Sequence, residues 1–437
     1  MPYNLPGKRS QEGWEADLKY VVTGRSSVAE SVPLVIERGE GVYFWDADGN
    51  RYLDFSAGIL TASTGHCHPH VIKRLQEQVP LLWHVYAFPT PQRARLCEML
   101  TEHLPPQIDT FCFYTGGSET IEAATRSCSS YRKAYLFASM THGYHGRTLM
   151  SRSLGPSLLN KVYGPTANVC HLPYPYCYRC PLKLQYPSCG LACIELADDL
   201  LQGSGHEPLA ALIFEPIAGA GGVLVPPPGA WQRLTDICRK REMLIIADEV
   251  LTGVGRTGKF MAIEHFGVQP DVMTFGKGLG SGFPIMCLAG RRDIISSYPF
   301  GEVGEGGAST SYGGNPLGAA AALGTLEAMF AEHMIENAAR LGEEIRTRLT
   351  PWVEKYRVVG DVRGLGLLWG IELVTDKTSK EPYPAWGWEQ IYHDCLNNGV
   401  RLVPNRICPP LNITSAQLHQ GLDVIEATIQ ALEKKPS

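Results

Sequence analysis

The sequence predicts an α/β protein, with a large domain built on a mostly parallel sheet and a smaller α+β domain. A chain of 437 residues is longer than one hydrophobic core usually supports, so two domains are expected. In the middle of the chain, short and continuously apolar runs alternate with longer helical patterns, which is typical of buried parallel strands. The C-terminal part changes to a mixture of strand and helix patterns that favours a separate small unit.

The N-terminal part is expected to contain a β-hairpin. Residues 41–55 hold two apolar runs on either side of the turn sequence Asp46-Ala-Asp-Gly-Asn50, which is a strong hairpin signal. Such a hairpin could pair with the C-terminal unit. We therefore assign residues 1–60 to the small domain.

The large domain is expected to span residues 61–325. From about residue 75, helical stretches such as Pro91 to Leu104 alternate with apolar runs that end in glycine-rich turns. The runs are too short and too continuously apolar for surface helices, so we predict that they are buried parallel strands. They lie within residues 109–117, 133–140, 209–219, 242–250 and 271–278.

The remainder of the small domain is expected to span residues 326–437. After Asn315-Pro316 the sequence predicts a long helix, followed by a second helix that ends near Lys355. Residues 358–374 have the pattern of strands, and further helices are expected near residues 388 and 417.

Composition argues against several classes of protein. The net charge of −5 gives no basic footprint for nucleic acid. The polar N-terminus lacks the apolar stretch that a signal peptide needs, and no run approaches the length of a membrane helix. We expect a cytoplasmic protein without membrane contact, whose 13 cysteines are kept reduced.

Three of the predicted strands end in residues with unusual chemistry, and ligands of open α/β sheets bind at the carboxyl ends of strands. The first is the turn Thr115-Gly116-Gly117-Ser118-Glu119, ahead of a helix expected to begin near Ile121. Its glycines let the backbone approach a ligand, and the unpaired N–H groups at the helix start suit phosphate. An ordinary strand-to-helix turn would have the same signature.

The other two strand ends carry Asp248 and Lys277. A carboxylate at the end of a buried strand is costly unless a positive group pairs with it, and a protonated heterocyclic nitrogen would serve. Lys277 lies among glycines, and desolvation favours the neutral amine that forms imines. Taken singly, Asp248 also fits a helix cap and Lys277 an edge lysine that reaches solvent. Together with the phosphate turn, they are what pyridoxal 5'-phosphate requires.

A glycine-rich segment argues for a different ligand. Gly253-Val-Gly255-Arg-Thr-Gly258-Lys259 fits the frames of both dinucleotide-binding and phosphate-binding loops. However, Phe260 stands where a Ser or Thr must reach magnesium, and no acidic ribose partner follows about 20 residues later. We therefore do not expect nucleotide binding at this segment.

A series of motifs runs along almost the whole chain: Gly65-His-Cys-His-Pro69, Tyr114 to Glu119, Tyr144-His-Gly-Arg-Thr148, Glu215-Pro, Asp248-Glu-Val, Gly253 to Gly258, Lys277, Gly313-Gly-Asn-Pro316 and Arg406-Ile-Cys-Pro-Pro410. In order and spacing the series resembles the class III, or omega-type, aminotransferases. This resemblance implies fold type I of the pyridoxal-phosphate-dependent transferases and an aminotransferase activity.

The resemblance implies a role for each matched residue at the cofactor. Gly117 and Ser118 bind the phosphate of pyridoxal 5'-phosphate. Tyr144 stacks on one face of the pyridine ring, and Val250 packs on the other. Asp248 pairs with the ring nitrogen.

The resemblance also implies how the substrate is handled. Lys277 is both the Schiff-base lysine and the proton shuttle, and Arg406 grips a substrate α-carboxylate with its planar fork. Ser311 stands where the family has a threonine that reaches the phosphate of the neighbouring subunit. The implied assembly is a homodimer with active sites at the interface.

Three departures from the family pattern bear on the substrate. Leu251 stands where many members have a glutamine near the phenolic oxygen of the cofactor. Ala220 replaces the acidic residue that in some members swings against the arginine, so that gate is not expected here. The segment from Gly399 to Arg406 is shorter than usual, which should open or reshape the substrate entrance.

A cysteine-rich segment leaves one question open. Cys177-Tyr-Arg-Cys180, followed by Cys189 and Cys193, has the paired spacing of a site for zinc or an iron–sulfur cluster. Similar loops occur in related sequences without an evident catalytic need for metal. We therefore assign no metal to the active site.

These observations predict an enzyme that moves an amino group from an amino acid, glutamate first, to a carbonyl acceptor in two half-reactions. The sequence looks closest to class III enzymes that aminate sugar rings in aminoglycoside antibiotic biosynthesis. The shortened segment and the missing gate fit such a bulky acceptor, and the aromatic segment from Trp83 to Phe88 could line its entrance.

Two alternatives stay open. The same fold supports dialkylglycine decarboxylases, which share the Gly-His-Cys-His-Pro motif, and amino acid or amino sugar epimerases. A nucleotide-binding or metal-stabilised protein without enzymatic activity is the alternative from another class. Visible absorbance by a bound cofactor would exclude the latter.

Overall fold

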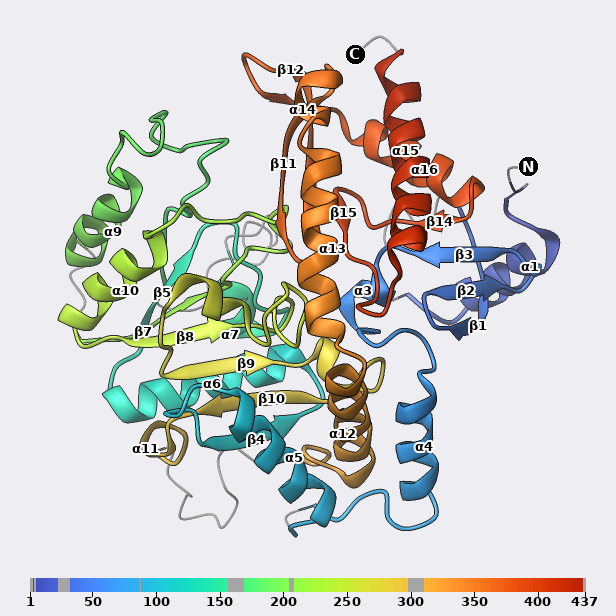
Figure 1. Ribbon diagram of the computed structural model, residues 1–437. Coiled ribbons are helices and arrows are strands. Elements are labelled where there is room, and N and C mark those ends of the chain that lie inside the picture. Colours follow the sequence, from blue (N-terminus) through green and yellow to red (C-terminus); the bar gives the residue numbers. More distant parts are fainter. Residues whose placement is uncertain are drawn as a thin grey trace.

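The computed structural model describes residues 3, 5–22, 32–86, 88–155, 169–203, 208–297 and 310–434. Figure 1 shows a large sheet surrounded by helices on one side of the molecule, and the chain ends with their smaller sheets on the other. Among the described residues, no helix combines the length and the apolar character needed to cross a bilayer.

The large sheet has seven strands in the order β4-β10-β9-β8-β7-β5-β6. Strands β9, β8, β7, β5 and β6 run parallel, whereas β10 is antiparallel to both of its neighbours. The strands are β4 (Thr110–Tyr114), β5 (Leu136–Met140), β6 (Val169–Leu172), β7 (Leu209–Phe214), β8 (Leu244–Asp248), β9 (Val272–Phe275) and β10 (Met286–Gly290). Every residue of β7 and β8 is buried, as expected of a parallel sheet covered on both faces.

Helices cover both faces of this sheet. α6 packs against β7, β9 and β10, while α9 and α10 lie against β6 and β8. α12 is almost wholly buried against α4 and α5. The helices of this region are α4 (Pro69–Gln78), α5 (Pro91–His103), α6 (Gly117–Arg132), α7 (Leu149–Ser153), α9 (Ala192–Gly203), α10 (Ala230–Lys240), α11 (Arg292–Ile295) and α12 (Pro316–Ala331), with short 3-10 turns η1 (Ala262–Phe266) and η2 (Lys277–Leu279).

The N-terminal sheet contains the predicted hairpin. β2 (Tyr43–Asp46) and β3 (Arg51–Asp54) pair antiparallel, and Asp46 closes their turn by accepting the N–H groups of Asp48 and Asn50. β1 (Ile36–Glu40) pairs with β2. On the other side, β3 pairs in parallel with β14 (Val400–Arg401), so the hairpin does join the C-terminal part of the chain. Helices α1 (Lys8–Leu18) and α3 (Ala57–Leu60) flank this sheet in sequence.

The C-terminal part forms a second small sheet with its own helices. β11 (Val359–Leu365) pairs antiparallel with β12 (Leu368–Asp376), which also pairs with β13 (Glu381–Pro382) and β15 (Arg406–Ile407). The helices are α13 (Met334–Leu349), α14 (Trp352–Lys355), α15 (Ala385–Asn397) and α16 (Ser415–Glu433).

The places of the five predicted strands are confirmed, but the sheet contains two further strands. All five predicted apolar runs contain a strand, but β6 and the antiparallel β10 were not expected. The helix expected to begin near Ile121 begins at Gly117, because the glycine turn itself forms the first helical residues. The helix expected to end near Lys355 ends at Leu349, and Pro351 starts a separate turn. The proposed domain boundaries stay a prediction.

Candidate active site

Six of the predicted site residues line one cavity of about 210 Å³ at the carboxyl edge of the large sheet. They follow strands β4, β5, β8 and β9 directly, which is why residues far apart in the sequence meet here. The six are Gly117, Ser118, Tyr144, Asp248, Val250 and Lys277, and the cavity is completed by His145, Gly146, Glu215, Ala220, Leu251 and Met286.

The glycine turn after β4 leaves space for an anion at the start of α6. A side-chain carbon added at Gly116 would meet no atom within 4 Å, and one added at Gly117 would first meet Met286 at 3.4 Å. The first N–H groups of the 16-residue helix α6 are not used by the helix itself. The hydroxyl of Ser118 lies at the same place and accepts the N–H of Arg147 at 2.9 Å. This is the donor set that binds phosphate.

Asp248 is buried and held by three donors. His145 Nδ1 lies 2.7 Å from one carboxylate oxygen. The other oxygen accepts the backbone N–H of Val250 at 3.1 Å and the hydroxyl of Thr274 at 3.2 Å. The opposite ring nitrogen of His145 is buried and has no hydrogen-bond partner within the described residues. The network therefore sets the orientation of the carboxylate within the cavity.

Glu215 is a second buried carboxylate beside Asp248. It accepts the backbone N–H of Tyr144 at 2.8 Å and that of Gly219 at 3.1 Å. Burial raises the pKa of Glu215 to about 7, helped by the negative charge of Asp248 and opposed by His145. Glu215 thus holds the two loops that carry Tyr144 and Ala220.

Lys277 begins the 3-10 turn that follows β9. Its backbone has φ +32°, which is unusual for a residue other than glycine. Burial lowers the pKa of its amine, against the opposing effect of the Asp248 and Glu215 carboxylates. Its amine has no hydrogen bond or ion pair within the described part of the chain. A strained backbone and a desolvated amine are both features of functional lysines.

Tyr144 and Val250 lie at the cavity on separate loops. Tyr144 is 42% exposed, and its hydroxyl accepts a hydrogen bond from Arg147 Nε at 3.2 Å. Val250 is half-buried, and its backbone is fixed by Asp248. An aromatic ring and a branched aliphatic side chain are thus available for a planar ligand between them.

Two predicted residues do not line this cavity. Ser311 is exposed at the turn before α12. Arg406 starts β15, and its Nε is buried without a hydrogen-bond partner among the described residues. Arg406 is nevertheless close enough that its positive charge contributes to the lowered pKa of Lys277, after the larger effect of burial.

Sequence reasoning did not assign a role to His145 or Met286. His145 stands inside the quoted motif Tyr144-His-Gly, so its signal was present, but its contact with Asp248 joins residues 103 positions apart. Met286 belongs to β10, the strand that was not predicted. Leu251 packs beside Gly219, where an added side-chain carbon would lie 2.5 Å from it. Leu251 therefore closes one side of the cavity.

The glycine-rich segment and the cysteine-rich segment both lie outside this cavity. In the glycine-rich segment, Arg256 is buried and donates to the carbonyls of Leu367 and Pro409, so this segment connects two parts of the fold. The four cysteines of residues 177–193 line one small cavity and form no disulfide. Across the residues that the structure describes, no three His, Cys, Asp or Glu side chains are grouped so as to hold a metal ion.

Comparison with known proteins gives a consistent result. A family model described as aminotransferase class-III matches residues 25–429. A leucine/methionine racemase of Thermococcus litoralis is 33% identical over 94% of this chain and 94% of its own length. A 4-aminobutyrate aminotransferase of Escherichia coli is 32% identical over 91% of this chain and 94% of its own. The PMP-bound aminotransferase structure from Vibrio fluvialis superposes with a TM-score of 0.91 at 26% identity, covering 99% of this chain and 100% of the other.

Proposed function

The chain belongs to the class-III aminotransferases, pyridoxal-phosphate-dependent enzymes of fold type I, and on this premise we propose which of its residues carry the reaction and on what substrates. The proposed reaction moves an amino group from an amino acid, glutamate first, to a carbonyl acceptor. The observation that carries it is the single cavity in which Lys277, Asp248 and the start of α6 meet.

The residues of the cavity fit pyridoxal 5'-phosphate. The open space at Gly116 and Gly117, with the hydroxyl of Ser118, suits the phosphate. Tyr144 and Val250 would hold the two faces of the ring. Asp248 would pair with the ring nitrogen, because a buried carboxylate needs a positive partner. When bound, the cofactor supplies an aldehyde that condenses with amino groups and a ring that accepts electrons from the substrate α-carbon.

The residues around the cofactor site would each perform one task. Lys277 Nζ would take the proton from the substrate α-carbon, since burial favours its neutral amine, and would deliver it to the carbon that comes from the cofactor's aldehyde. His145 would keep the Asp248 carboxylate oriented through its 2.7 Å hydrogen bond. Glu215 would hold the loops of Tyr144 and Ala220 in place through the two N–H groups that it accepts.

Arg406 would bind the α-carboxylate of the donor. Its Nε is buried without a partner among the described residues, and a guanidinium in that state gains most from a planar carboxylate. Ala220 places only a methyl group at the cavity, so no acidic side chain there competes for the arginine. This leaves room for a bulky acceptor, and we keep an oxidised amino sugar of aminoglycoside antibiotic biosynthesis as the acceptor to be tested beside simple 2-oxo acids.

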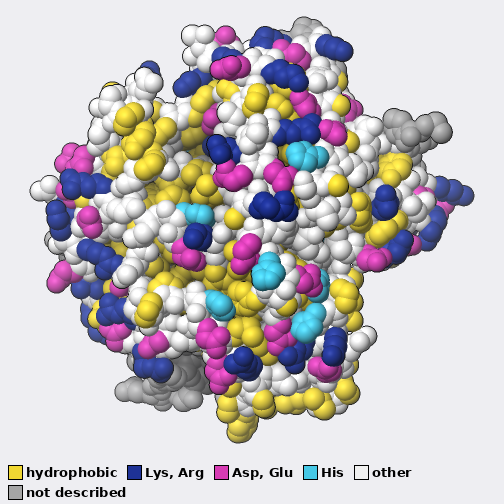
Figure 2. All heavy atoms as spheres, in the orientation of Figure 1, with side chains coloured by type: hydrophobic (Ala, Val, Ile, Leu, Met, Phe, Trp, Pro, Cys, Tyr) yellow, Lys and Arg dark blue, Asp and Glu magenta, His cyan; other side chains and the backbone are white. Residues whose placement is uncertain are grey.

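A homodimer would complete this site. Leu81, Trp83 and Phe88, in the segment between α4 and α5, are 72%, 62% and 71% exposed, and Figure 2 shows hydrophobic side chains gathered at the lower end of the molecule. The ring of His84 from this segment lies 5.4 Å from that of Tyr312, next to Ser311. Exposed apolar area of this kind marks protein interfaces. The proposed partner is a second copy, whose active site Ser311 would reach. A cytoplasmic location stays a prediction.

An amino acid racemase is the second candidate. It is favoured by the relative from Thermococcus litoralis, which is as similar to this chain as the aminotransferase of Escherichia coli is. A racemase returns the proton to the opposite face of the same α-carbon, whereas an aminotransferase places it on another carbon. The decarboxylation of dialkylglycines has no comparable observation in its favour.

One experiment separates these reactions. The purified enzyme with its cofactor is incubated in D₂O with L-glutamate, 4-aminobutyrate, L-leucine or L-methionine, with and without 2-oxo acids or an oxidised amino sugar. An aminotransferase releases one equivalent of oxo acid per site without an acceptor and turns over only with one. A racemase forms the D-amino acid, labelled at the α-carbon, without any acceptor. A dialkylglycine is incubated in parallel, and release of carbon dioxide from it would contradict both.

A further inference from the structure

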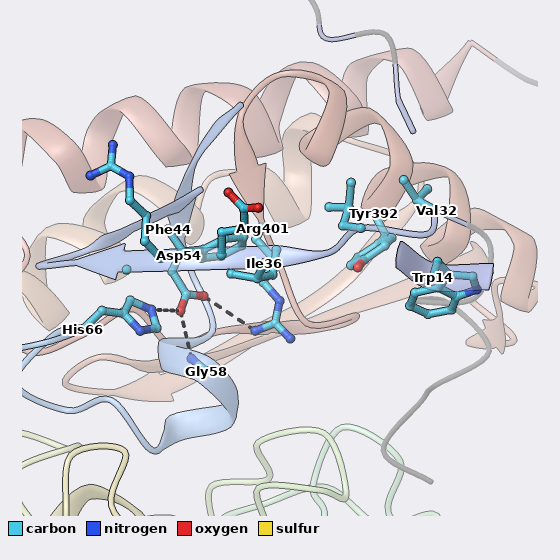
Figure 3. Close-up of a pocket in the computed structure, with 13 residues that line it drawn as sticks. Trp14, Val32, Ile36, Phe44, Asp54, Gly58, His66, Tyr392 and Arg401 are labelled. Carbon is cyan, nitrogen blue, oxygen red and sulfur yellow. Dashed lines mark hydrogen bonds and ion pairs between the residues drawn. The ribbon is translucent and has the colours of Figure 1, made fainter. Parts of the chain in front are cut away.

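A second and larger cavity lies between the N-terminal sheet and α15, away from the candidate active site. Its volume is about 420 Å³, twice that of the cavity at Lys277, and the two have no lining residue in common. Figure 3 shows side chains from α1, the N-terminal sheet, α15 and β14 converging on it. Cavities of this size hold small organic molecules.

One end of this cavity is built around Asp54, whose oxygens are already satisfied. Asp54 accepts the backbone N–H groups of Ser56 and Gly58 at 2.9 and 2.8 Å, and His66 Nε2 lies 2.8 Å from it. Burial alone would raise its pKa, but the hydrogen bond from His66 and the charge of Arg401 lower it below the usual value. Asp54 is therefore an anion, and its surroundings consume most of its acceptor capacity.

At the same end of the cavity, Arg401 has N–H groups that are available to a ligand. It enters the cavity from β14, and within the described residues its ion-pair partner is Asp54, with 3.6 Å between the nearest nitrogen and oxygen. This distance exceeds a hydrogen bond. No hydrogen bond of the Arg401 guanidinium is found within the described residues, although its side chain is only 28% exposed. A guanidinium that is mostly buried and without hydrogen bonds is matched by a carboxylate, which accepts two of its N–H groups.

The other end of the cavity is apolar and aromatic. Trp14, Val32 and Leu34 form this end with the ring of Tyr392, and Figure 3 places Trp14, Val32 and Tyr392 together on the side away from His66. The hydroxyl of Tyr392 lies near enough to Arg401 for that charge to lower its pKa, although burial raises the pKa overall. A ligand that fills the cavity would therefore have its apolar part against these walls and its charged group at Arg401.

The other charged groups near the cavity are paired with one another. Glu37 is paired with Arg9 at 2.5 Å, and Arg38 lies 4.0 Å from Glu40. Asp54 is held as described above. Among these groups, Arg401 is the cation whose N–H groups a ligand can engage.

We propose that this cavity binds small carboxylic acids with an apolar body, the carboxylate on Arg401 and the apolar part between Trp14, Leu34 and Tyr392. The site is separate from the aminotransferase site and has no catalytic group of its own in contact with the ligand. It would give the enzyme a second binding site for oxo acids or related acids with apolar side chains.

Isothermal titration of the holoenzyme with 3-phenylpropionate tests the proposal, because this probe has the required carboxylate and ring but no amino or keto group to react. We expect saturable binding that Arg401→Gln weakens about tenfold or more, the usual loss for a charge-assisted hydrogen bond to a carboxylate. Arg406→Gln is the matched control. It changes the arginine proposed for substrate and should leave this binding within about twofold.

Leu34→Trp is a second variant that tests the proposal even if Arg401→Gln disturbs β14. It fills the apolar end without changing any charge, and it should abolish binding while circular dichroism and the melting temperature stay close to those of the unchanged protein. Phenylpropionate binding that is lost in Arg406→Gln and retained in Arg401→Gln would assign the ligand to the active site and overturn the proposal. Absence of binding to the unchanged holoenzyme would overturn it as well.

Discussion

His145 Nδ1 lies 2.7 Å from Asp248 Oδ2, and both side chains are buried beneath the candidate active site. The pair joins the loop after β5 to the end of β8. The far ring nitrogen of His145 has no hydrogen-bond partner within the described residues. Because the imidazole is buried, we propose that it acts on Asp248 and, through Asp248, on the cofactor.

His145→Phe should therefore weaken both cofactor binding and turnover. Removing a hydrogen bond to a charged group costs about 1.5–3 kcal/mol, which corresponds to a loss of about 10- to 100-fold. The dissociation constant for pyridoxal 5'-phosphate and kcat/KM measure the two effects. His171→Gln is the control, because His171 contacts Ser139 and not Asp248. Equal losses of cofactor affinity and of kcat/KM in both variants would show that the contact of His145 with Asp248 has no special role.

Lys277→Ala should reduce turnover by at least about a thousandfold, since it removes both the nucleophile and the general base. A second readout does not depend on activity. After treatment with borohydride, mass spectrometry should find the cofactor attached to a peptide containing Lys277 in the unchanged enzyme and to no peptide in the variant. Lys259→Ala should behave like the unchanged enzyme. If the cofactor were found on Lys259 instead, the assignment of the cofactor to Lys277 would be wrong.

The stability of the apoenzyme should fall between pH 4.5 and pH 7 because of Glu215. Burial raises its pKa from 4.5 to about 7, so the folded protein holds a proton that the unfolded chain releases above pH 4.5. The stabilisation is complete below pH 4.5 and is lost as the pH rises to about 7. It amounts to about 3 kcal/mol.

Urea denaturation at several pH values checks this effect. In Glu215→Gln the unfolding free energy should decline less steeply over this pH range. This difference in slope is expected even if the substitution also changes the unfolding free energy by the same amount at every pH. Glu354→Gln, an exposed position in α14, should keep the slope of the unchanged protein. A slope that stays the same in Glu215→Gln would show that the carboxyl titrates normally.

Arg363→Met should destabilise the protein by about 1.5–3 kcal/mol, because it removes charge-assisted hydrogen bonds to two half-buried carboxylates. Glu372 keeps its ion pair with Arg179. Arg363 on β11 donates to Gly222 O and to Glu372, both at 2.7 Å, and to Asp361 at 2.8 Å. Gly222 is two residues from Ala220 at the active site, so KM should rise as well. Arg357→Met is the control at a more exposed position and should cost about 0.5 kcal/mol or less. Equal melting temperatures for the two variants would contradict this account.

The predictable part of the fold consists of segments with strong local patterns. The runs that became β7 and β8 are continuously apolar and fully buried, and the Asp46 turn makes the hydrogen bonds that its sequence suggests. β6 and β10 were missed for a physical reason. Val169–Leu172 is a short strand at the sheet edge, and Met286–Gly290 ends in small residues that resemble a loop.

For the candidate site, local motifs identified the residues that follow strands directly. The adjacent sequence was enough to identify Lys277, Asp248 and the Gly116-Gly117 turn as candidate site residues. The contact of His145 with Asp248 and that of Glu215 with the Tyr144 loop depend on loops brought together by the sheet. Their significance could not be inferred without the order of the strands.

The sequence by itself determined the fold class, the hairpin, the family and the unusual residues at three strand ends, because these depend on composition and on patterns within short segments. Only the tertiary structure decided the strand order, the burial that lowers the pKa of Lys277 and raises that of Glu215, and the cavity at Arg401. Arg401 and Asp54 are separated by hundreds of residues and meet because β14 pairs with β3. Burial and charge pairing arise from packing between distant segments, and no local pattern encodes them.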